Sequence, residues 1–191
     1  ARGYPLSWIF GRHDFNGVEL SVPRGVFVPR PETEELAETV LKATVEKGGR
    51  LRVLDFCSGS GCLAVFLALK NPLLSVFAVE KSARGAACIS GNAAKHGLKN
   101  IKTAKSRRIR AFGGKFDVIV SNPPYIPSSV IENLDAEVRM EPRAALDGGG
   151  DGLDMVRLIE KNAGKMLAPE GLLFLEFGDA QAESVKKIFR G

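Results

Sequence analysis

The sequence of 191 residues has few of the side chains that bind metals or form disulfide bonds. It contains two histidines and three cysteines. Neither His13 nor His96 has the spacing to a cysteine that zinc sites show. Cysteines in odd number, without a regular spacing, are typical of free thiols in a reducing compartment. We therefore expect small buried thiols, no metal site, and a cytoplasmic protein, or an organellar one in a eukaryote.

The sequence also lacks a long hydrophobic run. No apolar stretch approaches the roughly 20 residues of a membrane-spanning helix, and the opening ARGYPLSWIFGRHDF has no signal-peptide core. Hydrophobic residues make up 45% of the chain, the usual share for a globular domain. The net charge of +5 fits an acidic or nucleic-acid partner, but scattered surface lysines explain it equally well. Composition thus predicts a globular protein without a membrane segment.

The chain does have a regular alternation of apolar and amphipathic segments. The apolar runs predict strands at 51–56, 73–80, 100–105, 116–121 and 171–178. Helices are predicted between and after these strands, at 61–70, 82–97, 152–167 and 180–189. Apolar strands that alternate with such helices form a parallel sheet covered on both faces. The predicted fold class is therefore α/β, with a mostly parallel sheet.

Two further elements precede this sheet. Short β-type runs around Gly17 and Gly25 predict a β-hairpin. The following segment, PRPETEELAETVLKATVEK, predicts a helix with Pro31 in its first turn and two glycines, 48–49, at its end. Helical spacing predicts a buried face made of Leu36, Val40, Leu41 and Val45.

Three unusual stretches follow predicted strands: DFCSGSG (55–61), VEKS (79–82) and SNPPY (121–125). Because the carboxyl ends of parallel strands share one edge, where α/β folds bind ligands, we expect them around one cleft. Gly59 and Gly61 allow a tight turn and a close approach to a helix N-terminus. This glycine pattern is weak by itself, and a tight turn without any ligand would give the same spacing.

Two acids make the glycine turn more specific. Asp55 at the end of its strand would repel a pyrophosphate, but it suits a ligand with an ammonium group. Glu80 ends the next strand, where a carboxylate can accept both hydroxyls of a ribose. Together they predict a site for a nucleoside with a cationic tail, such as S-adenosylmethionine. The alternative for Glu80 is a solvated acid at the end of a strand.

The NPPY stretch suggests the chemistry. Asn122 offers a side-chain oxygen, Pro123 a carbonyl oxygen, and Tyr125 a ring that can pack against a planar group. Two such acceptors can hold the N–H groups of an amide and aim its nitrogen at an electrophilic methyl group, which is catalysis by positioning. Pro123 and Pro124 stiffen the loop. The alternative is a rigid loop without a chemical role.

With these motifs the chain resembles the HemK/PrmC family, the methyltransferases that modify the glutamine of the Gly-Gly-Gln motif in peptide-chain release factors. The resemblance is carried by GRHDFNG (11–17), VFVPRPETEEL (26–36), DFCSGSG, SNPPYI and EPRAALDGGGDGLD (141–154), in the family's order. It implies a Rossmann-like class I methyltransferase fold that uses S-adenosylmethionine. It also implies a site in which the cofactor contacts Phe15, Thr33, Asp55, Cys57, Ser58, Gly59, Ser60, Gly61, Glu80, Arg107 and Asn122, and the target glutamine contacts Asn122, Pro123, Pro124 and Tyr125.

The chain departs from the family at three places. Cys57 stands where the family usually has glycine, which should cost little if the residue does not need a positive φ. Glu80 replaces a commoner aspartate. Ser106 and Arg107 stand where the family usually has an acid-containing stretch beside the adenine, and the loss of that acceptor predicts weaker cofactor binding.

The resemblance also implies the domain organisation and the partner. Residues 1–30 would be a hairpin cap, the remnant of a link to a helical domain, and 31–191 a catalytic domain without its last strands. We expect a monomer that binds the GGQ loop of a release factor, with no membrane and no direct nucleic-acid contact. Alternatives are an NPPY-type methyltransferase acting on nucleic acid or another protein, a nicotinamide-dependent oxidoreductase, and a binding module without activity.

Overall fold

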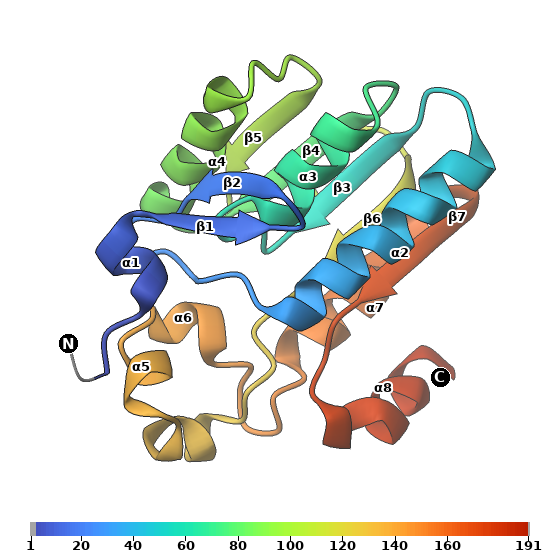
Figure 1. The fold of residues 1–191 in the computed structure, drawn as a ribbon. Coiled ribbons are helices and arrows are strands. Elements are labelled where there is room, and N and C mark those ends of the chain that lie inside the picture. The colour runs from blue at the N-terminus through green and yellow to red at the C-terminus, as the bar shows by residue number, and fades with distance from the viewer. Residues whose placement is uncertain (1–2, 191) are drawn as a thin grey trace.

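The centre of the molecule is a five-stranded parallel sheet, seen in a computed structural model that describes residues 3–190 (Figure 1). The strand order is β5-β4-β3-β6-β7. The bounds are β3 Arg52–Phe56, β4 Ser75–Glu80, β5 Ile101–Lys105, β6 Phe116–Ser121 and β7 Leu167–Leu175. All five predicted strands are confirmed, and the last begins at Leu167, earlier than predicted, with a register shift opposite Phe116 and Val118.

Helices cover both faces of this sheet, as the sequence predicts (Figure 1). One face is covered by α2 (Pro31–Lys47), α3 (Cys62–Lys70) and α4 (Ala83–Lys95), and the other by α7 (Asp154–Met166). The strands separate their side chains between two hydrophobic clusters with period two: Val53 and Val118 face α3, while Leu54 and Ile119 face α7. The chain reverses its winding direction between β3 and β6, and ligands bind at such a point.

The predicted hairpin is confirmed as β1 (Arg12–Phe15) and β2 (Val18–Ser21). Asn16 and Gly17 form its turn with φ of 48° and 74°, the left-handed backbone that two-residue hairpins favour. A short helix, α1 (Leu6–Phe10), precedes it and was not predicted. The run around Val26 forms no strand, because the chain from 22 to 30 crosses irregularly to α2.

The buried face of α2 agrees in part with the predicted one. Val40 is buried, and Leu36 and Leu41 pack partly buried against the core, but Val45 is 64% exposed. The helix also buries Thr33, Ala37 and Thr44. The two threonines can be buried because their hydroxyls are hydrogen-bonded, Thr33 to Glu176 and Thr44 to the carbonyl of Leu41. A pattern that counts only apolar residues therefore misses these threonines.

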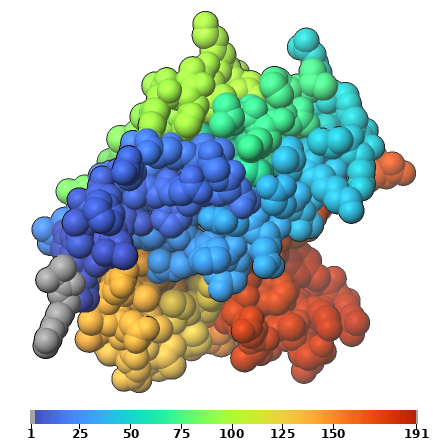
Figure 2. Space-filling view, viewed as in Figure 1, coloured from blue at the N-terminus to red at the C-terminus, as the bar shows by residue number. Residues whose placement is uncertain are grey.

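A lobe of short elements continues from β6. It contains η1 (Ser128–Asn133), α5 (Ala136–Arg139) and α6 (Arg143–Leu146), while η2 (Asp179–Gln181) and α8 (Ala182–Arg190) follow β7. Figure 2 shows this lobe, in yellow and orange, lying against the N-terminal segment in blue. Within residues 3–190, no helix combines the length and the apolar character that crossing a membrane requires.

Candidate active site

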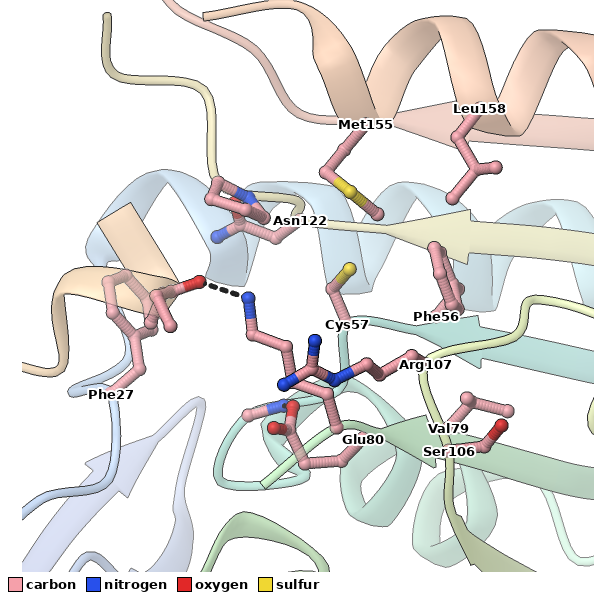
Figure 3. A pocket seen from close by; sticks show the side chains of 15 residues that line it. Phe27, Phe56, Cys57, Val79, Glu80, Ser106, Arg107, Asn122, Met155 and Leu158 are labelled. Carbon is pink, nitrogen blue, oxygen red and sulfur yellow. Dashed lines mark hydrogen bonds between the residues drawn. The ribbon is translucent and has the colours of Figure 1, made fainter. Parts of the chain in front are cut away.

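The stretches predicted to share one edge of the sheet do surround one cavity, of about 260 Å³ (Figure 3). The ends of β3 and β4 contribute Phe56, Cys57, Gly59, Val79, Glu80 and Lys81. Ser106 and Arg107 follow β5, Asn122 and Pro124 follow β6, and Met155 and Leu158 come from α7. One wall is thus mainly apolar, while the opposite one carries a carboxylate.

A second cavity, of about 220 Å³, adjoins the first. Its lining includes Arg30, Pro123 and Tyr125, and it shares Phe27, Asn122, Pro124 and Ala145 with the larger cavity. Asn122 therefore stands where the two cavities meet. A group held in one cavity can reach a group held in the other beside this side chain.

Asp55 lies beneath the glycine turn and does not line the larger cavity. It has no exposed surface, and its Oδ2 atom accepts hydrogen bonds from the hydroxyl of Ser58 (2.5 Å) and the backbone N–H of Ala64 (3.2 Å). Burial raises the pKa of Asp55 to about 7. Its Oδ1 atom has no hydrogen-bond partner within residues 3–190. Asp55 therefore orders the turn from below, and its predicted cofactor contact stays a prediction.

The remaining predicted residues of the turn are divided between cavity and core. Cys57 and Gly59 line the larger cavity, whereas Ser58 and Ser60 are buried and Gly61 begins α3 with φ of 84°. Phe15 is also buried completely, because the hairpin packs it edge-on against a phenylalanine of α3, with ring centroids 5.9 Å apart. Phe15 does not line the larger cavity, and its predicted cofactor contact stays a prediction.

Glu80 has the position predicted for it. It is 8% exposed and lines the larger cavity. The backbone N–H of Gly59 donates to its Oε2 atom (3.0 Å), and that of Ser82 donates to its Oε1 atom (2.8 Å). Since each carboxylate oxygen can accept more than one bond, both remain able to receive hydroxyl groups from the cavity. The two backbone bonds fix the orientation in which they do so.

Asn122 is held by a chain of side chains from distant segments. Its Nδ2 atom donates to the hydroxyl of Thr33 (2.9 Å), and this hydroxyl donates to Oε2 of Glu176 (2.8 Å). Thr33 is buried in the first turn of α2 and does not line the larger cavity. Glu176 follows β7 and was missed from the sequence, although the strand-end rule that selected Glu80 would have found it.

A buried ion pair joins two of the motifs singled out in the sequence. The carboxylate of Glu141, which has no exposed side-chain surface, pairs with Arg30 and accepts the backbone N–H of Val28 (2.9 Å). Burial raises the pKa of Glu141, while Arg30 acts against this shift. The pair joins PRPETE to EPRAAL at the rim of the smaller cavity, so Arg30 and Glu141 satisfy each other's charge without a ligand.

Comparison with known proteins identifies the family. A family model, the methyltransferase small domain, matches residues 24–167. A release factor glutamine methyltransferase of Geobacter sulfurreducens is 42% identical over 99% of this chain and 66% of its own length. Those of Thermodesulfovibrio yellowstonii and Moorella thermoacetica are 39% and 38% identical, over 96% and 100% of this chain and 67% and 68% of theirs. The chain belongs to the release factor glutamine methyltransferase family. It spans about two thirds of the length of these relatives.

Solved structures confirm the fold of this methyltransferase family member. A ribosomal protein L11 methylase from Lactobacillus delbrueckii matches with a TM-score of 0.62 over 88% of this chain and 72% of its own, at 21% identity. The human Mettl16 catalytic domain matches with a TM-score of 0.72 over 97% and 70%, at 16% identity. The predicted class I methyltransferase fold is thereby confirmed, and the oxidoreductase alternative finds no support in these comparisons.

Cys57 is a strained departure from the family's usual glycine. Its φ is 64°, in the left-handed region that glycine adopts without cost. The condition for a harmless substitution, an ordinary φ at this position, is therefore not met. Burial raises the pKa of the Cys57 thiol to about 12, so the side chain stays neutral beside Glu80. The strain is one of backbone geometry rather than of charge.

Ser106 and Arg107, the other departure from the family, do line the larger cavity. Figure 3 shows the Arg107 side chain extending across the cavity toward Glu80. The hydroxyl of Ser106 accepts the backbone N–H of Arg108 (2.9 Å). This part of the wall therefore presents a cation where the family usually presents an acid, and its effect on cofactor affinity stays a prediction.

Proposed function

We propose that this protein transfers a methyl group from S-adenosylmethionine to the side-chain amide nitrogen of the glutamine in the GGQ motif of peptide-chain release factors. The observation that carries the proposal is the meeting of the two cavities at Asn122. Its amide nitrogen is bonded to Thr33, so its oxygen is the atom directed to a ligand. The names of the relatives supply the substrate class.

The larger cavity would hold S-adenosylmethionine, which would supply an electrophilic methyl group on its sulfonium. Glu80 is placed to accept two ribose hydroxyls, and Gly59 and Cys57 bring the backbone close to the ligand. Phe56, Val79, Met155 and Leu158 form an apolar wall suited to a flat base. Asp55, buried beneath the turn, would add negative charge near a cationic ligand when it is ionised.

The smaller cavity suits the planar amide of a glutamine. The oxygen of Asn122 and the carbonyl of Pro123 would accept its two N–H groups, and Tyr125 would pack against the plane. Held in this way, the nitrogen would face the larger cavity. The N–C bond would form as the bond from the methyl group to the sulfonium sulfur breaks, which leaves S-adenosylhomocysteine, and the nitrogen would then lose a proton to water. Because the site would catalyse the reaction by positioning the amide nitrogen, no strong base is needed before the attack on the methyl group.

The test is methyl transfer from labelled S-adenosylmethionine to a bacterial release factor. We expect label in the release factor and none in a variant whose GGQ glutamine is replaced by alanine. Parallel reactions with duplex DNA and with ribosomal RNA test the alternative of an NPPY enzyme that acts on nucleic acid. Label in nucleic acid alone would overturn the proposal. Equal labelling of the wild-type release factor and its GGQ variant would overturn it as well.

A further inference from the structure

The chain of hydrogen bonds behind Asn122 has a direction. Asn122 Nδ2 donates to Thr33, so the single hydroxyl proton of Thr33 must go to another acceptor. That acceptor is Oε2 of Glu176, 2.8 Å away. A carboxylate only accepts hydrogen bonds, which makes the order from amide to hydroxyl to carboxylate the one consistent order while Glu176 is ionised.

This order decides which atom of Asn122 faces the cavities. With its nitrogen bonded to Thr33, the asparagine presents its oxygen, an acceptor. If Glu176 carried a proton, the chain could run the other way. Glu176 would then donate to Thr33, and Thr33 would donate to the amide oxygen. Asn122 would turn its NH₂ group toward the cavities, and a donor cannot hold the N–H groups of a target amide.

We propose that Glu176 is a positioning residue for methyl transfer, whose carboxylate fixes the direction of the Glu176–Thr33–Asn122 chain and so keeps the Asn122 oxygen toward the target. This inference rests on the proposed function. It assigns a role to an acid that follows β7, outside the NPPY stretch, and to the buried Thr33 hydroxyl. Neither residue needs to touch the cofactor.

The surroundings of Glu176 raise its pKa, so its protonation can be followed by lowering the pH. Burial raises its pKa above the usual glutamate value, and the charge of Glu32 on α2 adds to this, whereas Thr33, Tyr125 and Asn122 act against it as hydrogen-bond partners. Burial also raises the pKa of Tyr125, and the nearby cation Arg30 acts against this shift. Protonation of Glu176 as pH falls should therefore reverse the chain and reduce turnover, at a pH above that of an ordinary glutamate.

The first experiment compares pH profiles of methyl transfer to a release factor. We expect the wild type to lose turnover on the acidic side, with the acidic limb absent in Glu176→Gln. Since glutamine allows both directions of the chain, its turnover at neutral pH should fall roughly tenfold, the value of one hydrogen bond to a charged group. Glu160→Gln, an exposed acid on α7, is the matched control and should keep the wild-type profile.

The second experiment changes the hydroxyl in the middle of the chain. Thr33→Val keeps the shape of the side chain and removes both bonds, so turnover should fall roughly tenfold. Thr33→Ser retains the hydroxyl and should restore most of the turnover. Thr44→Val, at the other buried threonine of α2, is the control for removing a hydroxyl from this helix. Affinity for S-adenosylhomocysteine, measured by calorimetry, should be unchanged in these three variants.

A third measurement does not depend on activity. The side-chain NH₂ resonances of Asn122 should shift with pH in the wild type and stay constant in Glu176→Gln. If these resonances do not titrate in the wild type, or if Glu176→Gln keeps the acidic limb, the positioning role is wrong. If they titrate as expected but no release factor is methylated, Glu176 still fixes the direction of the hydrogen-bond chain, and it is the proposed function that fails.

Discussion

The two sides of the candidate active site are built in different ways. On the side of β3 and β4, the acids are held by nearby backbone: Asp55 by Ala64, 9 residues away, and Glu80 by Gly59, 21 residues away. On the side of β6 and β7, the bond from Asn122 to Thr33 joins residues 89 apart, and that from Thr33 to Glu176 joins residues 143 apart. The proposed cofactor side is therefore preorganised locally, whereas the proposed target side depends on the docking of distant segments.

The largest expected effect comes from removing the residue at which the two sides meet. Asn122→Ala deletes one of two acceptors for the target amide, and the loss of one preorganised hydrogen bond typically lowers turnover about 10²-fold. The fold should be intact, because Pro123 and Pro124 still stiffen the loop. Turnover is measured with labelled S-adenosylmethionine and a release factor, and stability by thermal unfolding.

The matched control for this change is Asn133→Ala, at an exposed asparagine of η1. It should leave turnover and stability at the wild-type values. If Asn122→Ala methylates the release factor at the native rate, NPPY is only a rigid loop here and the proposed mechanism fails.

Breaking the ion pair that docks the distant segments should give the next largest effect. Glu141→Ala leaves Arg30 and the backbone N–H of Val28 without their acceptor, which should lower the free energy of unfolding by about 2 to 3 kcal/mol. The loss of binding should be confined to the proposed target side of the site. We expect weaker binding of the release factor and unchanged affinity for S-adenosylhomocysteine, measured by calorimetry.

The control is an acid of a solvent-exposed pair, Glu132, whose partner Arg143 is also exposed. Glu132→Ala should cost well under about 1 kcal/mol, as is usual for exposed ion pairs. Equal losses of cofactor and target binding in Glu141→Ala would show that the two sides are not independent.

The same contrast explains how much of the site was predictable from the sequence. The glycine turn and Glu80 could be predicted because strand ends, glycines and acids lie close together in the sequence, and the alternation of strands and helices fixes their edge. The bonds from Thr33 to Glu176 and from Arg30 to Glu141 could not, since no local pattern shows which distant side chains will meet. The complete burial of Phe15 could not be predicted for the same reason, because the packing of the hairpin on α3 decides it.

Removing the backbone strain at Cys57 should stabilise the proposed cofactor side of the site. With φ of 64°, this residue adopts a conformation that costs a non-glycine residue about 1 kcal/mol. Cys57→Gly should therefore raise the free energy of unfolding by about this amount, measured by denaturant titration. Cys88→Gly, in the interior of α4, should have the opposite sign, because glycine destabilises helices. A loss of stability in Cys57→Gly would mean that packing of the thiol outweighs the strain.

The smallest expected effect concerns the basic wall of the larger cavity. Ser106→Asp places a carboxylate beside the proposed adenine site and restores an acceptor for its amino group, worth about 1 kcal/mol, or roughly fivefold in Kd. The loop should tolerate the change, because aspartate can accept the backbone N–H of Arg108 as Ser106 does now. Calorimetry with S-adenosylhomocysteine measures the gain. Ser90→Asp, on the exposed side of α4, adds the same charge away from the cavity and should leave the affinity unchanged. If Ser106→Asp binds no more tightly than the wild type, Arg107 already compensates for the missing acid, and the departure from the family is neutral for the cofactor.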